Sequence, residues 1–131
     1  MTNTGRTLMR LRRCGFMSAV VEKWLRKIDR RQDLWGFADV IACHPREGFL
    51  LVQTTSAAHV GDRLAKAKAR PELAIWLAAG GRFEVHGWAR RAGGWRCRVV
   101  EVRAGDLEPM ELVALPKRRR GRLLQPASLF S

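Results

Sequence analysis

The sequence predicts an α/β domain built on a mixed β-sheet that is flanked by helices. Three observations lead to this prediction: a basic amphipathic segment at the start, two strand-like apolar runs joined by a Pro-Gly turn, and a further pair of strands after two helical segments. A chain of 131 residues is long enough for one domain with its own core. We expect that domain over residues 1–105 and a basic tail over residues 106–131.

The first quarter of the chain predicts one helix and is then ambiguous. Residues 4–14 have leucines three positions apart with basic residues on the other side, and Gly15 is a typical helix stop. Residues 17–28 fit either a helix or a buried strand, because periodicity alone does not decide short apolar runs. The polar stretch 27–33 predicts a loop.

The centre of the chain predicts an antiparallel hairpin. The runs FADVIAC (37–43) and FLLVQT (49–54) are strand-like, and the HPREG segment between them has the Pro and Gly of a turn. Such a turn pairs positions whose numbers sum to about 92, which sets Asp39 opposite Gln53 on one face of the sheet. Because side chains alternate along a strand, Thr55 projects from that face as well.

The second half predicts helices and then strands. Ser56 is a candidate N-cap for a basic helix whose apolar residues recur at three- and four-residue intervals. Pro71 starts a second helical segment, which the next Gly-Gly pair ends. Two more strands are expected at 82–88 and 95–103.

Positive charge dominates the composition. The chain carries 25 Lys and Arg against 12 Asp and Glu, a formal net charge of +13. A field of this sign attracts polyanions, so nucleic acid is the first partner to consider. The window 32–60 is the exception, because it holds one basic residue against Asp33, Asp39 and Glu47. Cations around a group of carboxylates suit a metal-dependent enzyme that acts on a phosphate backbone, and an ordinary solvated surface is the alternative.

Two classes of protein are excluded. No stretch approaches the roughly 18 consecutive apolar residues of a membrane span, and the first residues lack the apolar run of a secretory signal. We therefore expect a soluble cytoplasmic protein with no membrane partner. The three cysteines, Cys14, Cys43 and Cys97, are far apart and show no CxxC or CxxH pairing, which predicts reduced core thiols and no structural zinc.

A leading helix, Asp39 in a strand, LVQTT in the next strand and then a basic helix resemble the PD-(D/E)XK nuclease superfamily, particularly its small Holliday-junction-resolvase-like members. The resemblance covers about residues 4–100 and implies a restriction-endonuclease-like αβββαβ core, here with an extra strand. Asp39 matches the family's Asp, and Gln53, 14 residues later, matches the Glu-or-Gln of its (E/Q)xK motif. RRQDLWGFAD is also similar to an RxDLxGxxD-type segment of small phage-related members whose third strand ends in VQxT.

The resemblance implies a Mg²⁺ or Mn²⁺ site that hydrolyses phosphodiester bonds of duplex or branched DNA. The residues implied in the site are Asp39, Gln53, Thr55 and Glu22, with metal held by Asp39, Gln53 and Glu22, and with Asp33 as a further member. Magnesium is held by one or two carboxylates with other oxygens and waters, so a neutral Gln predicts weaker metal binding than a Glu would give. Thr55 stands where the family usually has Lys. Water must then be positioned by Thr55 itself, by a second metal, or by an amine such as Lys23 or Lys66.

Each of these residues also has a purely structural interpretation. Asp39 would be a partly exposed strand acid, although an isolated charge in an apolar strand is costly unless it is paired or metal-bound. Gln53 and Thr55 would form a polar strand end. Glu22 would pair with Arg26 at helical i, i+4 spacing, and Asp33 would cap a turn.

The cations expected to hold a phosphate backbone are Arg12, Arg13, Arg31, Arg63, Lys66 and Lys68. Trp88 and Trp95 are candidates for base stacking, although packing is the commoner role. The apolar segment 112–115 is a candidate homodimer contact, and the KRRRGR run at 117–122 predicts a solvated basic tail. Two alternative functions stay open: a catalytically inactive nucleic-acid-binding module of the same fold, and an unrelated basic α/β protein that binds RNA or another protein.

Overall fold

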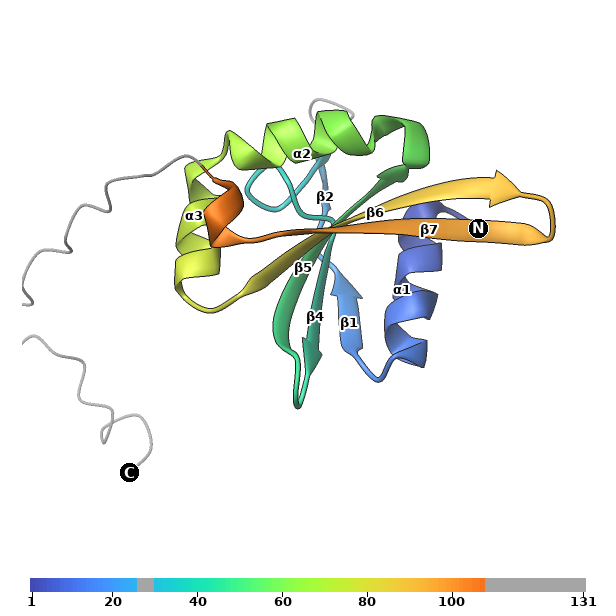
Figure 1. Ribbon diagram of the computed structural model, residues 1–131, viewed down its shortest axis with the longest axis horizontal. Helices are drawn as coiled ribbons and strands as arrows, with labels where there is room; N and C mark the ends of the chain where they lie inside the picture. Colours follow the sequence, from blue (N-terminus) through green and yellow to red (C-terminus); the bar gives the residue numbers. More distant parts are fainter. Residues whose placement is uncertain (26–29, 108–131) are drawn as a thin grey trace, which may run out of the picture.

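The computed structural model describes residues 1–25 and 30–107 (Figure 1). Residues 26–29 and 108–131 lie outside this description, as do the side chains of residues 23–25, 30 and 31. The expected dimer contact at 112–115 and the KRRRGR run therefore fall outside it.

The described chain is an α/β domain with a five-stranded mixed sheet, which confirms the predicted class. The helices and strands are α1 (Asn3–Arg13), β1 (Met17–Val20), β2 (Lys23–Leu25), β3 (Arg30–Gln32), β4 (Val40–His44), β5 (Gly48–Ser56), α2 (Val60–Lys68), α3 (Pro71–Ala78), β6 (Arg82–Arg91) and β7 (Gly94–Val102). The sheet order is β1-β4-β5-β6-β7, in which β5 and β6 are parallel and the other neighbours are antiparallel. β2 and β3 pair only with each other.

Helices cover both faces of the sheet (Figure 1). On one face, Leu11 of α1 packs with the buried side chains Val40 and Leu50. On the other face, Val60 of α2 and Leu73 of α3 pack in a larger cluster, which also contains Phe37, Leu51, Phe83 and Val85. Each such fully buried side chain stabilises the fold by roughly 1.5–3 kcal/mol. None of the described helices is long and apolar enough to cross a membrane.

The central hairpin has the predicted register. Val40 pairs with Val52 and His44 with Gly48, so paired positions sum to 92. Gly48 has a positive φ of 76° at the turn, a conformation that favours glycine. The pairing extends one residue before β4, because the Asp39 N–H donates to the Val52 carbonyl at 2.9 Å.

The ambiguous segment after α1 is extended, not helical. β1 pairs with β4, and β2 pairs with β3, so the helical conformation behind the proposed i, i+4 pairing of Glu22 with Arg26 is wrong; Arg26 itself lies outside the described residues. The loop expected at 27–33 is also wrong for residues 30–32, which form β3. A polar stretch can form a strand here because β2 and β3 pair with each other in a small sheet separate from the five-stranded one.

Three further expectations need correction. The first predicted strand begins at Val40 and not at Phe37, because residues 34–38 turn back on themselves before it. Ser56 makes no side-chain capping bond, since it is the last residue of β5, and a 3₁₀ turn (Ala57–His59) separates it from α2. Cys14 is an exposed thiol and not a core one, because it follows the last turn of α1.

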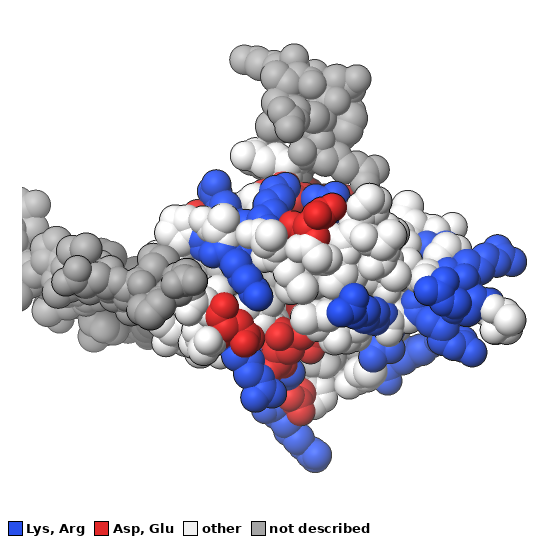
Figure 2. Space-filling model, turned by 45° about the horizontal axis from the view of Figure 1, so that its top comes forward, with Lys and Arg blue, Asp and Glu red and all other residues white. Residues whose placement is uncertain are grey.

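β6 and β7 form a hairpin that runs past the end of β5. The last residue of β5, Ser56, pairs with Trp88, whereas β6 and β7 stay paired as far as Arg91 and Gly94. Figure 2 shows Lys and Arg gathered at the right-hand end of the molecule, which is where this hairpin ends in Figure 1. Acidic side chains lie nearer the centre, among other basic ones.

Gly87 lets the start of α2 approach β6, which predicts a stability loss on substitution. A Cβ at Gly87 would overlap Val60 Cγ2 and lie 3.1 Å from Ala57 Cα. Gly87→Ala is expected to lower the free energy of unfolding by about 1–3 kcal/mol in urea denaturation. Gly61→Ala is the matched control: its Cβ meets open space within α2, so stability should rise by about 0.5–1 kcal/mol. Equal stability of the two variants would contradict this packing.

Candidate functional site

The site is centred on Asp39, a carboxylate that is only 4% exposed. Its Oδ2 accepts three hydrogen bonds: from Gln53 Nε2 at 2.7 Å, from the Thr54 backbone N–H at 2.8 Å, and from Thr54 Oγ1 at 3.0 Å. These donors all meet one carboxylate oxygen, and Oδ1 takes no part in them. The hydrogen bonds therefore fix the orientation of a buried carboxylate.

The β1–β4 pairing brings Glu22 beside Asp39. Val20 pairs with Val40 at the end of β1, and the Val21 N–H then donates to the Asp39 carbonyl at 2.8 Å. Glu22 is the next residue, and it is half-buried. The sequence left the conformation around Glu22 ambiguous, and the pairing of the edge strand β1 with β4 now places this residue beside Asp39.

A tight loop brings Asp33 to the same place. Leu34 and Ala38 form an antiparallel bridge, with the Leu34 N–H donating to the Ala38 carbonyl at 2.8 Å. Continuing that pairing by one residue sets Asp33 opposite Asp39. The loop closes through two left-handed residues, Trp35 with φ of 54° and Gly36 with φ of 79°.

Packing holds this loop in its strained conformation. Phe37 is fully buried and meets Phe83 edge-on, with ring centroids 5.2 Å apart. Arg70 Nε donates to the Trp35 carbonyl at 3.0 Å, and the Trp35 ring lies 6.1 Å from that of Trp76. A left-handed tryptophan costs of order 1–3 kcal/mol and persists only where its surroundings enforce it. The contacts with Arg70 and Trp76 provide that enforcement.

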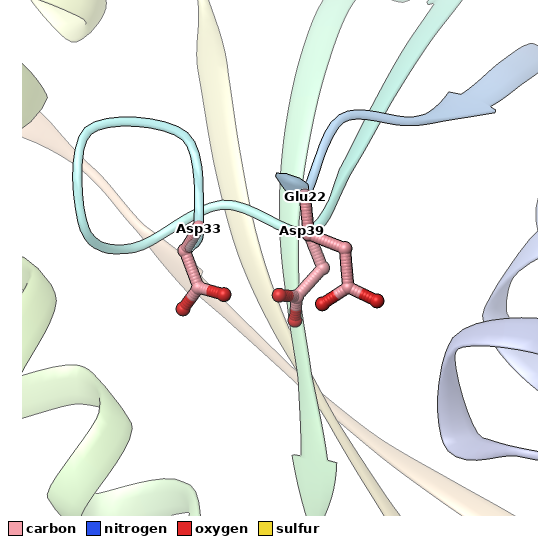
Figure 3. Close-up of side chains that lie close together, drawn as sticks. All are labelled: Glu22, Asp33 and Asp39. Carbon is pink, nitrogen blue, oxygen red and sulfur yellow. The ribbon is translucent and has the colours of Figure 1, made fainter. Parts of the chain in front are cut away.

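The three carboxylates meet in one cluster (Figure 3). One ligand oxygen from each of Glu22, Asp33 and Asp39 lies within 4.8 Å of the others. Carboxylate oxygens are the ligands that Mg²⁺ and Mn²⁺ prefer, and such ions accept several waters beside one to three carboxylates. The donor set therefore fits a hard divalent cation.

The clustering changes the acidity of Asp39. The pKa of Asp39 is raised from 3.8 to about 7; burial is the largest cause, and the adjacent Asp33 contributes by hydrogen bonding and by like charge. The Thr54 hydrogen bonds act in the opposite direction. Without a cation, this group of acids therefore retains a proton near neutral pH. A bound divalent cation would offset the same repulsion.

The structure brings together most of the site residues that the sequence predicts. Glu22, Asp33 and Asp39 share the cluster, and Gln53 reaches Asp39 as the predicted register requires. Gln53 presents its N–H group to Asp39, so in this arrangement it positions the carboxylate. Thr55 is buried and is paired along the backbone with Gly87, and it is not among the donors to Asp39.

Thr54 is the functional residue that the sequence reasoning missed. It gives Asp39 two of its three hydrogen bonds, and its hydroxyl lies 3.0 Å from that of Thr4 in α1. The alternation of the strand argued against it, because Thr54 projects from the face opposite to that of Gln53. The hydrogen bond from its backbone N–H could still have been predicted, because the hairpin register places Asp39 next to Thr54 at the end of the β4–β5 pairing.

The basic residues expected to bind nucleic acid divide between two places. Arg63 and Lys66 of α2 line a shallow hollow of about 210 Å³ with His59 and Asp62. Lys68 lies on the same helix and is exposed.

The other expected cations do not join this group. Arg12 and Arg13 end α1 beside Gly15, which lies against His44 at the opposite end of β4 from Asp39. The side chains of Lys23 and Arg31 lie outside the described part of the chain. The structure therefore assembles the α2 cations and leaves the α1 pair at the far edge.

Comparison of the chain with protein-family models, with curated proteins and with solved structures gives no match. The functional argument therefore depends on the geometry of the site and on the residues that build it.

Proposed function

We propose that this chain is a metal-dependent, endonuclease-like domain that hydrolyses phosphodiester bonds of DNA. The observation that carries the proposal is the convergence of Glu22, Asp33 and Asp39, from three separate segments, at the edge of the sheet. Burying Asp39 among other acids costs stability, and a cation-binding function accounts for that cost. The charge of +13 supplies the affinity for a polyanionic substrate.

Each part of the site has a role in this proposal. A divalent metal such as Mg²⁺ or Mn²⁺ would be held by Asp39, Glu22 and Asp33; when bound, it neutralises charge on the phosphate and lowers the pKa of a water. Gln53 and Thr54 hold the Asp39 carboxylate in place by hydrogen bonds. The α2 cations bind backbone phosphates without reading sequence.

The resemblance to the PD-(D/E)XK superfamily supports the proposal. Apart from the small β2–β3 sheet inserted after β1, a helix, three antiparallel strands, helices and a strand parallel to β5 follow in the order that the resemblance implies, with β7 as the extra strand. Asp39 and Gln53 occupy the expected positions of that motif and contact each other. A preference for junctions or branched DNA belongs to the proposal through this resemblance alone.

One observation favours a second candidate, a catalytically inactive DNA-binding module. Thr55 stands at the position of the usual Lys, and its side chain cannot supply the positive charge that a Lys would place beside the reacting phosphate. One oxygen of Asp39 already accepts three hydrogen bonds without a metal, as in a purely structural site.

Cleavage of DNA by wild type and two variants tests the proposal. Supercoiled plasmid, linear duplex, single-stranded DNA and a four-way junction are incubated with Mg²⁺ or Mn²⁺. Asp39→Ala is expected to lower the cleavage rate at least about 100-fold, since it removes the central metal ligand. Glu47→Ala is the matched control, because Glu47 is an exposed acid at the β4–β5 turn, away from Asp39 and from the α2 cations, and it should retain the wild-type rate.

Binding of the same DNA is measured in parallel in the presence of a chelator. Cleavage by wild type no greater than that of Asp39→Ala, with binding intact, would reject the nuclease and support the binding module. If the wild-type protein neither binds nor cleaves any of these DNAs, both candidate functions are rejected.

A further inference from the structure

The projecting part of the β6–β7 hairpin has two faces of different character. Side chains alternate along each strand, and opposed residues share a face. Val85 and Gly87 face α2, so Ala89 and Arg91 follow on that face. Across the hairpin, Arg98 pairs with Gly87 and Arg96 with Ala89. We call this the arginine face; its charged members are Arg91, Arg96 and Arg98.

The aromatic residues of the hairpin lie on the opposite face and are engaged there. Trp88 Nε1 donates to Thr7 Oγ1 of α1 at 3.0 Å. The Arg6 guanidinium lies 3.5 Å from the centre of the Trp95 ring. Both tryptophans thus tie the hairpin to α1, and their base-stacking role stays a prediction.

The arginine face carries positive charge that no described carboxylate neutralises. Arg91, Arg96 and Arg98 are exposed, and within residues 1–25 and 30–107 none of them forms an ion pair. The base of the same sheet is different, because Arg82 pairs with Glu47 and Glu101 at 2.7 Å and 2.6 Å. Within the described β6–β7 hairpin, the unpaired arginines of this face thus lie toward the turn, away from the ion pairs of Arg82.

The shape of the face leaves room for a backbone. Arg91 and Arg98 line a hollow of about 470 Å³ between the hairpin and the start of α2. The rest of its lining is Trp88 and the small residues Ala57, Ala58 and Ala89, with Ser56 at the end of β5. Two guanidiniums and a hydroxyl around this hollow are suited to phosphate oxygens.

The position of the face relative to the acidic cluster indicates a duplex. Gln53 of β5 pairs with Val85 of β6. Gly87 is two residues further along β6, and it pairs with Arg98 of β7, so Arg98 is two strands away from Gln53 and two residues further along. At about 4.8 Å between strands and 3.3 Å per residue, this is on the order of 12 Å from Gln53. The start of α2 packs on Gly87 between these positions, so the cluster and the arginine face contact separate stretches of backbone, as the two strands of a duplex provide. The major groove of B-DNA also admits a two-stranded β-ribbon.

We propose that the arginine face of the β6–β7 hairpin docks on the phosphate backbone of duplex DNA, across one groove from the phosphate that reaches the Glu22–Asp33–Asp39 cluster. The inference rests on the proposed function for its partner, DNA, but not on cleavage. An A-form RNA duplex has a major groove too narrow and deep for such a ribbon, and single strands lack a second backbone at this distance. The face is therefore specific for the shape of a DNA duplex and not for its sequence.

The test measures binding of a short duplex of mixed sequence by fluorescence anisotropy, in chelator, over a range of salt concentrations. Replacing Arg91, Arg96 and Arg98 by Gln is expected to weaken binding roughly 100-fold or more at about 0.1 M salt, and to reduce the slope of log K against log salt by about 2.7. The charge-matched control replaces Arg12, Arg13 and Arg46 by Gln at the far edge of the sheet, and should leave the slope close to wild type.

The outcomes separate this inference from the proposed function. Wild-type binding by the hairpin variant, or an equal loss in the control, would overturn the docking surface while leaving cleavage and its dependence on Asp39 untouched. Equally tight binding of single-stranded DNA or duplex RNA, weakened to the same extent in the hairpin variant, would overturn the assignment to duplex DNA. All three arginines are exposed, so an unchanged melting temperature shows that the variant is folded.

Discussion

Asp39→Asn is expected to make the metal-free protein more stable at about pH 8, by on the order of 2–4 kcal/mol, and to leave it nearly unchanged at about pH 4. Burial and Asp33 raise the pKa of Asp39 from 3.8 to about 7 in the folded protein. Between these two values the folded state keeps a proton that the unfolded state has lost. The free energy of unfolding therefore falls as the pH rises through this window, and the loss is complete above the folded pKa. Asn is neutral throughout and avoids that loss.

Urea denaturation of wild type and Asp39→Asn at several pH values, in chelator, measures the effect. Asp62→Asn serves as the control, because the Asp62 side chain is 87% exposed on α2, with His59 Nδ1 3.7 Å away. The difference between Asp39→Asn and wild type should grow from pH 4 to pH 8, and that for Asp62→Asn should stay small. A variant that is less stable than wild type at the higher pH would show that Asp39 is stabilising as a carboxylate, contrary to the proposed site.

Mg²⁺ or Mn²⁺ is expected to reverse the destabilisation in wild type. A cation that binds only the folded state at about 100 times its dissociation constant adds about 2.7 kcal/mol to the free energy of unfolding. The cation must displace the proton that Asp39 retains near neutral pH, so the stabilisation should weaken as the pH falls below 7. Asp33→Asn should reduce the gain, because it removes one of the three carboxylates.

Melting temperatures with increasing Mg²⁺, Mn²⁺ or Na⁺ at matched ionic strength measure this gain. Asp39→Asn should lose the response to divalent ions, whereas Asp62→Asn should keep it. Equal responses of all variants would mean that the ions act on the general charge of the protein and not at the cluster.

The acidic cluster lowers the stability of the metal-free fold while providing the carboxylates that the proposed function needs. Asp39 is oriented by Gln53 and Thr54 yet repelled by Asp33, and the loop that carries Asp33 holds a left-handed Trp35. Natural sequences accept such local costs where activity depends on them. The two stability experiments measure this cost directly, independently of any cleavage assay.

Local rules were sufficient for the central hairpin. Period two and the Pro-Gly turn between the runs set the pairing of β4 with β5, and hence the contact of Asp39 with Gln53. Pro71 at the start of α3 and the turn between β6 and β7 were predictable in the same way, because the chemistry of each lies within a few residues.

Local rules failed where one segment depends on another. Residues 17–20 and 23–25 are strands because β1 meets the edge of β4 and β2 meets β3, and no pattern within the segment contains that information. The strand expected from Phe37 begins at Val40 because Phe37 is needed in the core against Phe83. Burial of that one ring turns the preceding residues into a loop.

The sequence by itself determined the positive charge, the α/β class and the pairing that joins Asp39 to Gln53, because each depends on composition or on neighbours in the chain. Only the tertiary structure decided that Glu22 and Asp33 join them, since that requires an edge strand and a loop held by Arg70 and Trp76. It also decided which face of the β6–β7 hairpin is free. Packing of Trp88 and Trp95 against α1 occupies one side and leaves the arginines on the other.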